Sequence, residues 1–438
     1  MTHHNIIFIS IDSLRADAVS ALGVEATTTP FFNELIKQSS LYTAAFSQGI
    51  WTVPSHTSIF TGLYPTEHGV YDEDAVSEGE VSLGDHPTIG QKLQENGYET
   101  RAFFRLGWLS SAGILRGFEF ESKNPDDEGS SIVSTLDSLS SKLPAGRTFL
   151  RAIYRGTFRG HMADKDVVSD AVSAIQAASE PFCHFVHLND AHWPYSPVNP
   201  FHDQFTDHRF PTLFWNRAYV QSRMFPLADD SWTPSTEQIE VMKDLYLGAV
   251  RQVDHHLESL ITAIPDDVLN ETIIIVFGDH GEAFGESDEL GHNDIIPSVA
   301  HVPLLIRDPT GQLSSGRVDA PVQLADLYET VGSLTGITVP DTNSNDLTEG
   351  PPDDPAFTHS GQNEVDDSLL GKYGVWRSAS DYLIWDAVND TVERHGDADG
   401  LKDELDSRIE DLKHVPPTGT KALDDEAKDR LRELGYLQ

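Results

Sequence analysis

Two acidic residues, each at the end of an apolar run, are candidates for a catalytic or metal-binding role. Asp12 follows the run 5–11, and Asp279 and His280 follow 273–277 after one glycine. Apolar runs of this length are typical of strands buried on both faces, and parallel strands end at one edge of a sheet. Two carboxylates and an imidazole there can bind Mg²⁺, Mn²⁺, Ca²⁺ or Zn²⁺. The pair predicts a cation site, although each Asp alone is more typical of a turn or helix cap.

A third segment supplies a hydroxyl group. Pro54 suits the first turn of a helix that runs to about Thr61, and Gly62 suits its end. Thr52 would then lie at the helix N-terminus, where free N–H groups and the helix dipole stabilise an anion such as sulfate or phosphate. Taken alone, Thr52 would be only a helix cap.

The elements that must position these residues alternate along the chain. Further strand-like runs lie at about 99–105, 182–188 and 302–306, and helical spacing of apolar residues occurs at about 30–38, 88–96, 163–178, 236–263 and 323–335. This alternation predicts an α/β fold with a mainly parallel central sheet flanked by helices. In such sheets the ligand site lies at the carboxyl ends of the strands.

The composition changes beyond about residue 340. Residues 341–355 are rich in Asp, Asn, Gly and Pro, which is typical of a linker or a long surface loop. The runs 356–360, 372–377 and 381–388 predict a small antiparallel sheet, and charged helices are expected near 400–413 and 423–435. We therefore predict a large catalytic domain over 1–340 and a small C-terminal α+β subdomain over 356–438.

Together, these motifs resemble the sulfatase family of the alkaline-phosphatase superfamily. The resemblance rests on an ordered set: Asp12, Thr52-Val53-Pro54-Ser55-His56, 61–65, 68–70, 190–195, 279–282 and Gly291-His292, with 431–436 similar to sulfatase C-termini. It covers about residues 5–335. It implies a large α/β domain with a central sheet, and a smaller C-terminal domain with a short antiparallel sheet.

The resemblance also implies a metal centre. Asp12, Asp279 and His280 would bind one divalent ion together with the Thr52 oxygen, and Ca, Mg, Mn and Zn are not distinguished. Ser13 occupies the position at which many sulfatases have a second Asp, so the expected metal site has one carboxylate ligand fewer.

Two further histidines match family positions. His192 matches the histidine that contacts the transferred group or the leaving oxygen, and His292 matches a cationic position near the leaving group. Both are therefore expected to be catalytic. Asp190 and His192 could contribute to a second metal site, but their spacing differs from that of two-metal relatives.

Two residues depart from the family signature C/S-x-P-S-R, in which Cys or Ser becomes formylglycine. The chain has Thr52 at the first position and His56 at the last. Threonine cannot form the aldehyde, so we expect no formylglycine and a threonine nucleophile, as in phosphodiesterase and phosphoglycerol transferase relatives. His56 weakens the fixed positive charge expected beside the nucleophile, and we include it among the catalytic candidates.

The predicted function is a metal-dependent enzyme that cleaves or transfers a sulfuryl or phosphoryl ester group. Its expected partner is an anionic ester, either a saccharide or a lipid-linked glycan. Alternatives are a transferase in cytoplasmic glycan assembly and a non-catalytic protein that binds anionic glycans, which the complete set of chemical groups disfavours. Five aromatic residues could stack on sugar rings, although packing over the core is the more common role: Trp193, Tyr195, Trp215, Tyr219 and Trp232.

Several other residues have simpler interpretations. Cys183 is the only cysteine, which excludes an intramolecular disulfide, and its apolar surroundings predict a core residue. His184 shares a strand face with Phe182 and predicts a satisfied core histidine, whereas the role of His187 on the opposite face stays open. For His68, a site role and a loop role are equally supported.

Charge and hydropathy exclude several protein classes. The chain has 438 residues, with 30 Lys and Arg against 70 Asp and Glu, a net charge of −40 and a pI of about 4.6. This balance argues against nucleic-acid binding. No apolar run reaches the length of a membrane span, and a strand that starts at Asn5 leaves no room for a signal peptide, so a cytoplasmic location is expected.

The acidic excess also predicts adaptation to concentrated salt and a haloarchaeal source. Added KCl should raise the thermal transition temperature up to molar concentrations, because screening relieves repulsion within the −40 charge. Calorimetry across a KCl series would test this. A transition temperature that does not change with salt would contradict it.

Overall fold

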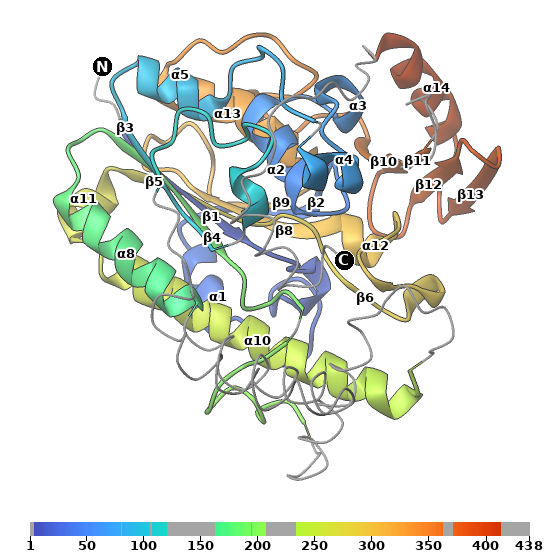
Figure 1. The fold of residues 1–438 in the computed structure, drawn as a ribbon, viewed down its shortest axis with the longest axis horizontal. Helices are drawn as coiled ribbons and strands as arrows, with labels where there is room; N and C mark the ends of the chain where they lie inside the picture. The colour runs from blue at the N-terminus through green and yellow to red at the C-terminus, as the bar shows by residue number, and fades with distance from the viewer. Residues whose placement is uncertain are drawn as a thin grey trace.

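A seven-stranded sheet forms the centre of this computed structural model (Figure 1). The structure describes residues 4–79, 81–105, 107–120, 163–193, 195–206, 234–361 and 371–412. Several sequence predictions lie outside these residues: the aromatic residues Trp215, Tyr219 and Trp232, the helix near 423–435 and the motif at 431–436.

The strand order is β3-β4-β1-β5-β8-β2-β9, and every strand except β8 runs in the direction of β1. The strands are β1 (Asn5–Ile11), β2 (Ser40–Phe46), β3 (Glu99–Phe103), β4 (Phe182–Leu188), β5 (Thr272–Gly278), β8 (His301–Arg307) and β9 (Gly316–Gln323). Two of them, β2 and β9, were not predicted. Small and polar residues interrupt β2, and β9 contains Pro321, which is tolerated because this strand lies at the sheet edge.

Helices cover both faces of the sheet (Figure 1). One face packs beneath α2 (Thr52–Thr61), α5 (Ile89–Glu95) and α13 (Leu327–Thr335), and the other packs against α1 (Pro30–Ile36), α8 (Ala163–Ala177) and α10 (Thr236–Thr262). The side chains of β1 alternate between the two cores: Phe8 faces the first, and Ile7 and Ile9 face the second. The predicted α/β fold with a mainly parallel, doubly covered sheet is confirmed.

A second, antiparallel sheet lies at one side of the molecule (Figure 1). Its order is β10-β11-β12-β13, formed by Ala356–Gly361, Gly371–Trp376, Tyr382–Asp386 and Thr391–His395, and α14 (Leu401–Asp411) packs on it. Trp376 of this sheet stacks on Phe46 of β2 at 5.1 Å between ring centroids. The sequence predicted three of these strands. It missed β13, whose residues are mostly exposed and polar.

The register of the central sheet aligns the ends of three strands. Ile11 pairs with Leu188 of β4 on one side and with Gly278 of β5 on the other. The residues that follow these strands therefore meet at one edge. Among the described residues, no helix is long and apolar enough to cross a membrane.

Candidate active site

Asp12 and Asp279 lie side by side at this sheet edge, and both are completely buried. The backbone N–H of Asp12 donates to Leu188 O at 2.9 Å, and that of Asp279 donates to Ile11 O at 3.3 Å. Gly278 lets the end of β5 lie close to the backbone at Leu14, because a Cβ atom at position 278 would lie 2.3 Å from the Leu14 carbonyl oxygen. Both predicted carboxylates therefore enter the same site.

The two oxygens of Asp279 differ in their surroundings. Oδ1 accepts the backbone N–H groups of His280 at 2.8 Å and Ser13 at 3.2 Å, and Ser13 adopts a left-handed conformation with φ of 57°. Oδ2 is buried and has no hydrogen-bond partner. One carboxylate oxygen is therefore held in place, while the other is left for an additional partner.

His280 presents one ring nitrogen to both carboxylates. Its Nδ1 donates to Gly281 O at 2.8 Å, so Nε2 of the neutral ring carries a lone pair. That Nε2 lies 3.3 Å from Asp12 Oδ1 and 3.8 Å from Asp279 Oδ2. A backbone acceptor on the second nitrogen is typical of a metal-binding histidine.

Thr52 is brought to the same place by α2. The helix runs from Thr52 to Thr61, so Trp51 and not Thr52 holds the N-cap position, and Thr52 is the first helical residue. Gly62, with φ of 70°, is the glycine C-cap, as predicted. Thr52 Oγ1 lies 3.5 Å from His280 Nε2. The Ser55 hydroxyl, one turn further along, donates to Asp279 O at 2.7 Å and ties the start of the helix to the end of β5.

His56 lies behind Thr52 and is completely buried. Its Nδ1 donates to Thr52 O at 2.8 Å, and its Nε2 accepts from the Ser10 hydroxyl at 2.8 Å. Burial lowers the pKa of His56 to about 3, so the ring is neutral. It therefore orders the first turn of α2 without adding a positive charge.

The residues around Thr52 fit a divalent cation. Among the described residues, the ion-pair partners of Asp12 and Asp279 are all histidines, with no Lys or Arg. Burial opposes a charge on His280, yet Asp279 and Asp12 raise its pKa to about 10, which shows the negative potential at this point. Buried carboxylates need such compensation, and two carboxylates with an imidazole can supply it by binding a metal ion.

His292 and His192 complete one wall of the site. The His292 ring lies 4.5 Å from the His280 ring and 5.6 Å from the His192 ring, measured between centroids. His292 Nδ1 donates to the buried Glu282 carboxylate at 3.3 Å, and His192 Nδ1 donates to Trp193 O at 2.5 Å. The bond to Glu282 leaves the Nε2 atom of His292 for other contacts.

The loop after β4 reaches Asp12 but directs Asp190 elsewhere. The Asn189 amide donates to Asp12 Oδ2 at 2.7 Å. Asp164 of α8 fixes this loop by accepting the N–H groups of Asn189 and Asp190 at 2.9 and 2.7 Å. Asp190 binds Gln252 and His256 of α10, so it does not join His192 in a second metal site here.

Sequence reasoning missed three residues of the site: Ser10, His187 and Asn189. His187 is completely buried, and its Nε2 lies 3.3 Å from Asp12 Oδ2. Alternation along β4 correctly placed His187 opposite His184. Its position near the end of β4, beside the end of β1, was the available signal, because this edge also holds Asp12.

The remaining singled-out residues belong to the core. His184 packs between Phe103 and Phe182, as predicted for a core residue, but neither of its ring nitrogens has a hydrogen-bond partner. Cys183 is buried. Tyr195 is 1% exposed and packs against Tyr246, which is a core role and leaves no face for a sugar ring.

His68 has a structural position at the end of the short helix α3 (Pro65–His68). Its Nδ1 accepts the Val70 N–H at 3.0 Å, and its Nε2 lies 3.2 Å from the Ser58 hydroxyl of α2. Through Ser58, the His68 ring packs against the side of α2 that faces away from the carboxylates. Of the two roles left open by the sequence, these contacts favour the structural one.

Comparisons with known proteins find similarity in both sequence and fold. A family model described as Sulfatase matches residues 4–337. Iduronate 2-sulfatase of Mus musculus is 24% identical, with 77% of this chain and 69% of the relative covered. An arylsulfatase of Clostridium perfringens is 21% identical, with coverage of 77% and 76%. The structure of a phosphonate monoester hydrolase of Agrobacterium radiobacter superposes with a TM-score of 0.68 at 20% identity, covering 93% and 94%.

The buried His68 makes stability depend on pH. Burial lowers its pKa to about 3, below the value of about 6.5 in an unfolded chain, so between these values the unfolded state binds more protons. The contribution of the neutral His68 ring to the free energy of unfolding is fully present above pH 6.5 and is lost as the pH falls below that value. From pH 6 to pH 5 the loss should be about 1 kcal/mol.

Urea unfolding at both pH values would measure this loss. The His68→Gln variant should show a shallower pH dependence, whereas His255→Gln, on the exposed side of α10, should keep that of the wild type. Equal slopes for the wild type and His68→Gln would contradict the assignment.

Proposed function

The chain belongs to the sulfatase family, and from this premise we propose that it hydrolyses a sulfate or phosphate ester with Thr52 as nucleophile. One observation carries the proposal. The Thr52 hydroxyl lies at the N-terminus of α2, 3.5 Å from His280 Nε2, at the sheet edge that holds Asp12 and Asp279. Backbone N–H groups at a helix start favour an incoming anionic group.

Asp12, Asp279 and His280 would hold one divalent ion, with the Thr52 oxygen beside them. The unpartnered Asp279 Oδ2 supports this assignment. When bound, such an ion polarises the ester and favours the ionised form of the nucleophile. This assignment leaves His56 outside the ligand set, because both of its ring nitrogens are already bonded.

In the first step, the ionised Thr52 oxygen, which has already released its proton to solvent, attacks the sulfur or phosphorus atom. A new bond forms to Thr52, and the bond to the leaving alcohol oxygen breaks. The helix start stabilises the negative charge that arrives at this point. His56 acts as a positioning residue, since its bond to Thr52 O fixes the turn that carries the hydroxyl.

His292 is the proposed general acid. In its doubly protonated form, the ring donates its Nδ1–H to Glu282, which keeps it oriented, and the second proton, on Nε2, is the one given to the leaving oxygen. His192, whose ring lies 5.6 Å from that of His292, would contact the transferred group. In the second step, water attacks the covalent threonine ester, one of its protons returns to His292, its oxygen stays on the released sulfate or phosphate, and Thr52 leaves as the ionised oxygen.

The chemical class of the substrate is an anionic ester, and we favour a saccharide carrier. The name iduronate 2-sulfatase refers to a sulfated sugar, whereas phosphonate monoester hydrolase refers to a phosphorus ester. A threonine cannot use the aldehyde route by which the family expels sulfate, so both ester classes need to be assayed. In the transferase alternative, a saccharide hydroxyl would replace water in the second step.

The metal assignment is tested by Asp12→Asn and Asp279→Asn. Each change removes an anionic ligand, so both variants should lose the bound divalent ion and activity together. Metal analysis after gel filtration would measure occupancy. Asp254→Asn changes a buried carboxylate that accepts backbone N–H groups of α1, and it should retain the ion. Full occupancy in both site variants would overturn the assignment.

The nucleophile is tested by Thr52→Ala and Thr52→Ser. The alanine variant should lose turnover, while the serine variant keeps a hydroxyl and should retain measurable activity. A purely structural role would leave turnover intact in both variants and change only stability. Sulfate monoesters, phosphate monoesters and phosphate diesters would be assayed in parallel, which also identifies the ester class.

Thr57→Ala is the matched control, since Thr57 is also buried in α2 but bonds only to Val53 O. It should remain active. Intact mass spectrometry with a slow substrate should locate an added sulfuryl or phosphoryl mass on Thr52. Normal turnover by Thr52→Ala would eliminate the covalent route.

A further inference from the structure

Asp164 lies outside the site, yet its carboxylate binds the loop that carries two of the site's side chains. It belongs to the first turn of α8 and is 1% exposed. Its Oδ1 accepts the Asn189 N–H at 2.9 Å, and its Oδ2 accepts the Asp190 N–H at 2.7 Å. The Asn189 carbonyl in turn accepts the His192 N–H at 2.9 Å. One buried carboxylate therefore holds the turn from Asn189 to His192 at its first two N–H groups.

We propose that Asp164 is a positioning residue that sets both the metal ligand Asp12 and the wall residue His192 through this turn. The inference rests on the proposed function, because it concerns the ion and the transferred group of the same site. Both oxygens of Asp164 are bonded to backbone N–H groups of the loop, so its effect on the chemistry passes through the loop alone.

The first route leads to the metal ligand. The Asn189 amide donates to Asp12 Oδ2 at 2.7 Å, and the other oxygen, Oδ1, faces His280 Nε2 at 3.3 Å. The bond to Oδ2 orients the carboxylate so that Oδ1 is presented to the ion. Removal of a hydrogen-bond partner of a metal ligand typically lowers metal affinity by about 10–100-fold. Loss of the Asp164 bonds should therefore weaken metal binding through Asn189.

The second route leads to His192, whose N–H is bound within the same turn. Asp190 directs its side chain away from the site and accepts hydrogen bonds from Gln252 and, at 3.2 Å, from His256 of α10. The loop is thus tied to α8 and α10, two helices that cover the same face of the sheet (Figure 1). These bonds fix the position of the turn, and with it the ring that the proposed mechanism places beside the transferred group.

A double-mutant cycle in Mn²⁺ affinity tests the first route. In Asp164→Asn, the side-chain NH₂ cannot accept an N–H group, so the affinity measured by isothermal titration calorimetry should fall about tenfold. Asn189→Ala removes the amide that reaches Asp12 and should cause a similar loss. Because both changes act on one path, Asp164→Asn should add little further loss in the Asn189→Ala background. Titrations at pH 8 keep Asp164 mostly ionised, since burial and the neighbouring Asp190 raise its pKa to about 7.

Turnover at saturating Mn²⁺ tests the second route. With the ion bound, Asp164→Asn should still lower kcat by about tenfold or more, because a small displacement of His192 moves it away from the reacting group. Asp166→Asn is the matched control, since Asp166 lies in the same helix but pairs with Arg105 at 2.6 Å. This variant should keep the Mn²⁺ affinity and the kcat of the wild type.

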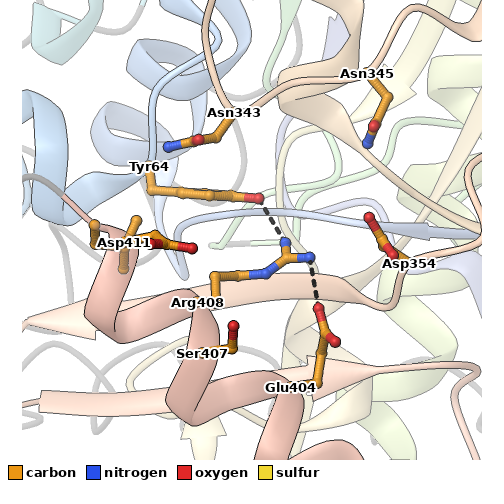
Figure 2. A pocket seen from close by; sticks show the side chains of 9 residues that line it. Tyr64, Asn343, Asn345, Asp354, Glu404, Ser407, Arg408 and Asp411 are labelled. Carbon is orange, nitrogen blue, oxygen red and sulfur yellow. Dashed lines mark hydrogen bonds and ion pairs between the residues drawn. The ribbon is translucent and has the colours of Figure 1, made fainter.

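A second control separates loss of stability from loss of positioning. Figure 2 shows Arg408 in a pocket beside α14, where it donates to the Tyr64 hydroxyl at 2.7 Å and to Glu404 at 3.3 Å. Arg408→Gln breaks these bonds and should lower the stability of the chain. Its Mn²⁺ affinity should match that of the wild type, because Arg408 has no contact with the loop after β4.

Additive losses in the cycle, about a hundredfold in the double variant, would show that Asp164 and Asn189 act independently and would overturn the proposal. Wild-type Mn²⁺ affinity and kcat in Asp164→Asn would also overturn it. In both cases, loss of the ion in Asp12→Asn would leave the proposed function intact, whereas unchanged binding there would remove the metal centre itself. If Asp164→Asn fails to fold, Asp164→Glu, which keeps two acceptor oxygens on a longer side chain, enters the same cycle with the same criterion.

Discussion

The burial of two neighbouring carboxylates at the end of β1 and β5 is the constraint on which the site depends. Asp12 and Asp279 have no contact with solvent, and no Lys or Arg among the described residues pairs with either one. Two neighbouring buried carboxylates repel each other, and both lose their hydration. Backbone N–H groups, an amide and histidines surround the two carboxylates, and the proposed cation between them would compensate this cost further.

The sheet positions these groups through register alone, which is why much of the site could be predicted from the sequence. Apolar runs identified β1 and β5, and parallel strands that pair along their length must end together. Asp12, Asp279 and His280 therefore met as expected. Thr52 followed from Pro54 and Gly62, which mark the start and end of α2 by their own backbone preferences.

What the sequence could not predict depends on contacts between distant segments. Nothing in the residues around Asn189 indicates that Asp164, on a helix 25 positions earlier, accepts the backbone N–H groups of its loop. The role of His187 stayed open, because apolar neighbours in β4 give the same pattern whether the facing layer is hydrocarbon or carboxylate. The edge strand β9 was also missed, since an edge position tolerates the residues that central strands exclude.

The polar residues beneath α2 explain how the helix is fixed without changing the charge of the site. Ser47 donates to Ser55 at 3.0 Å, Ser55 donates to Asp279 O, and Ser10 donates to the neutral His56 ring. Each of these hydrogen bonds joins uncharged groups, so none of them neutralises the charge of the two carboxylates. His56 Nδ1 lies 3.7 Å from Asp279 Oδ2, and an arginine in place of His56 would add a fixed positive charge near this carboxylate. With a neutral imidazole there, the positive charge that the carboxylates require would come from the start of α2 and from the proposed ion, and both lie next to Thr52.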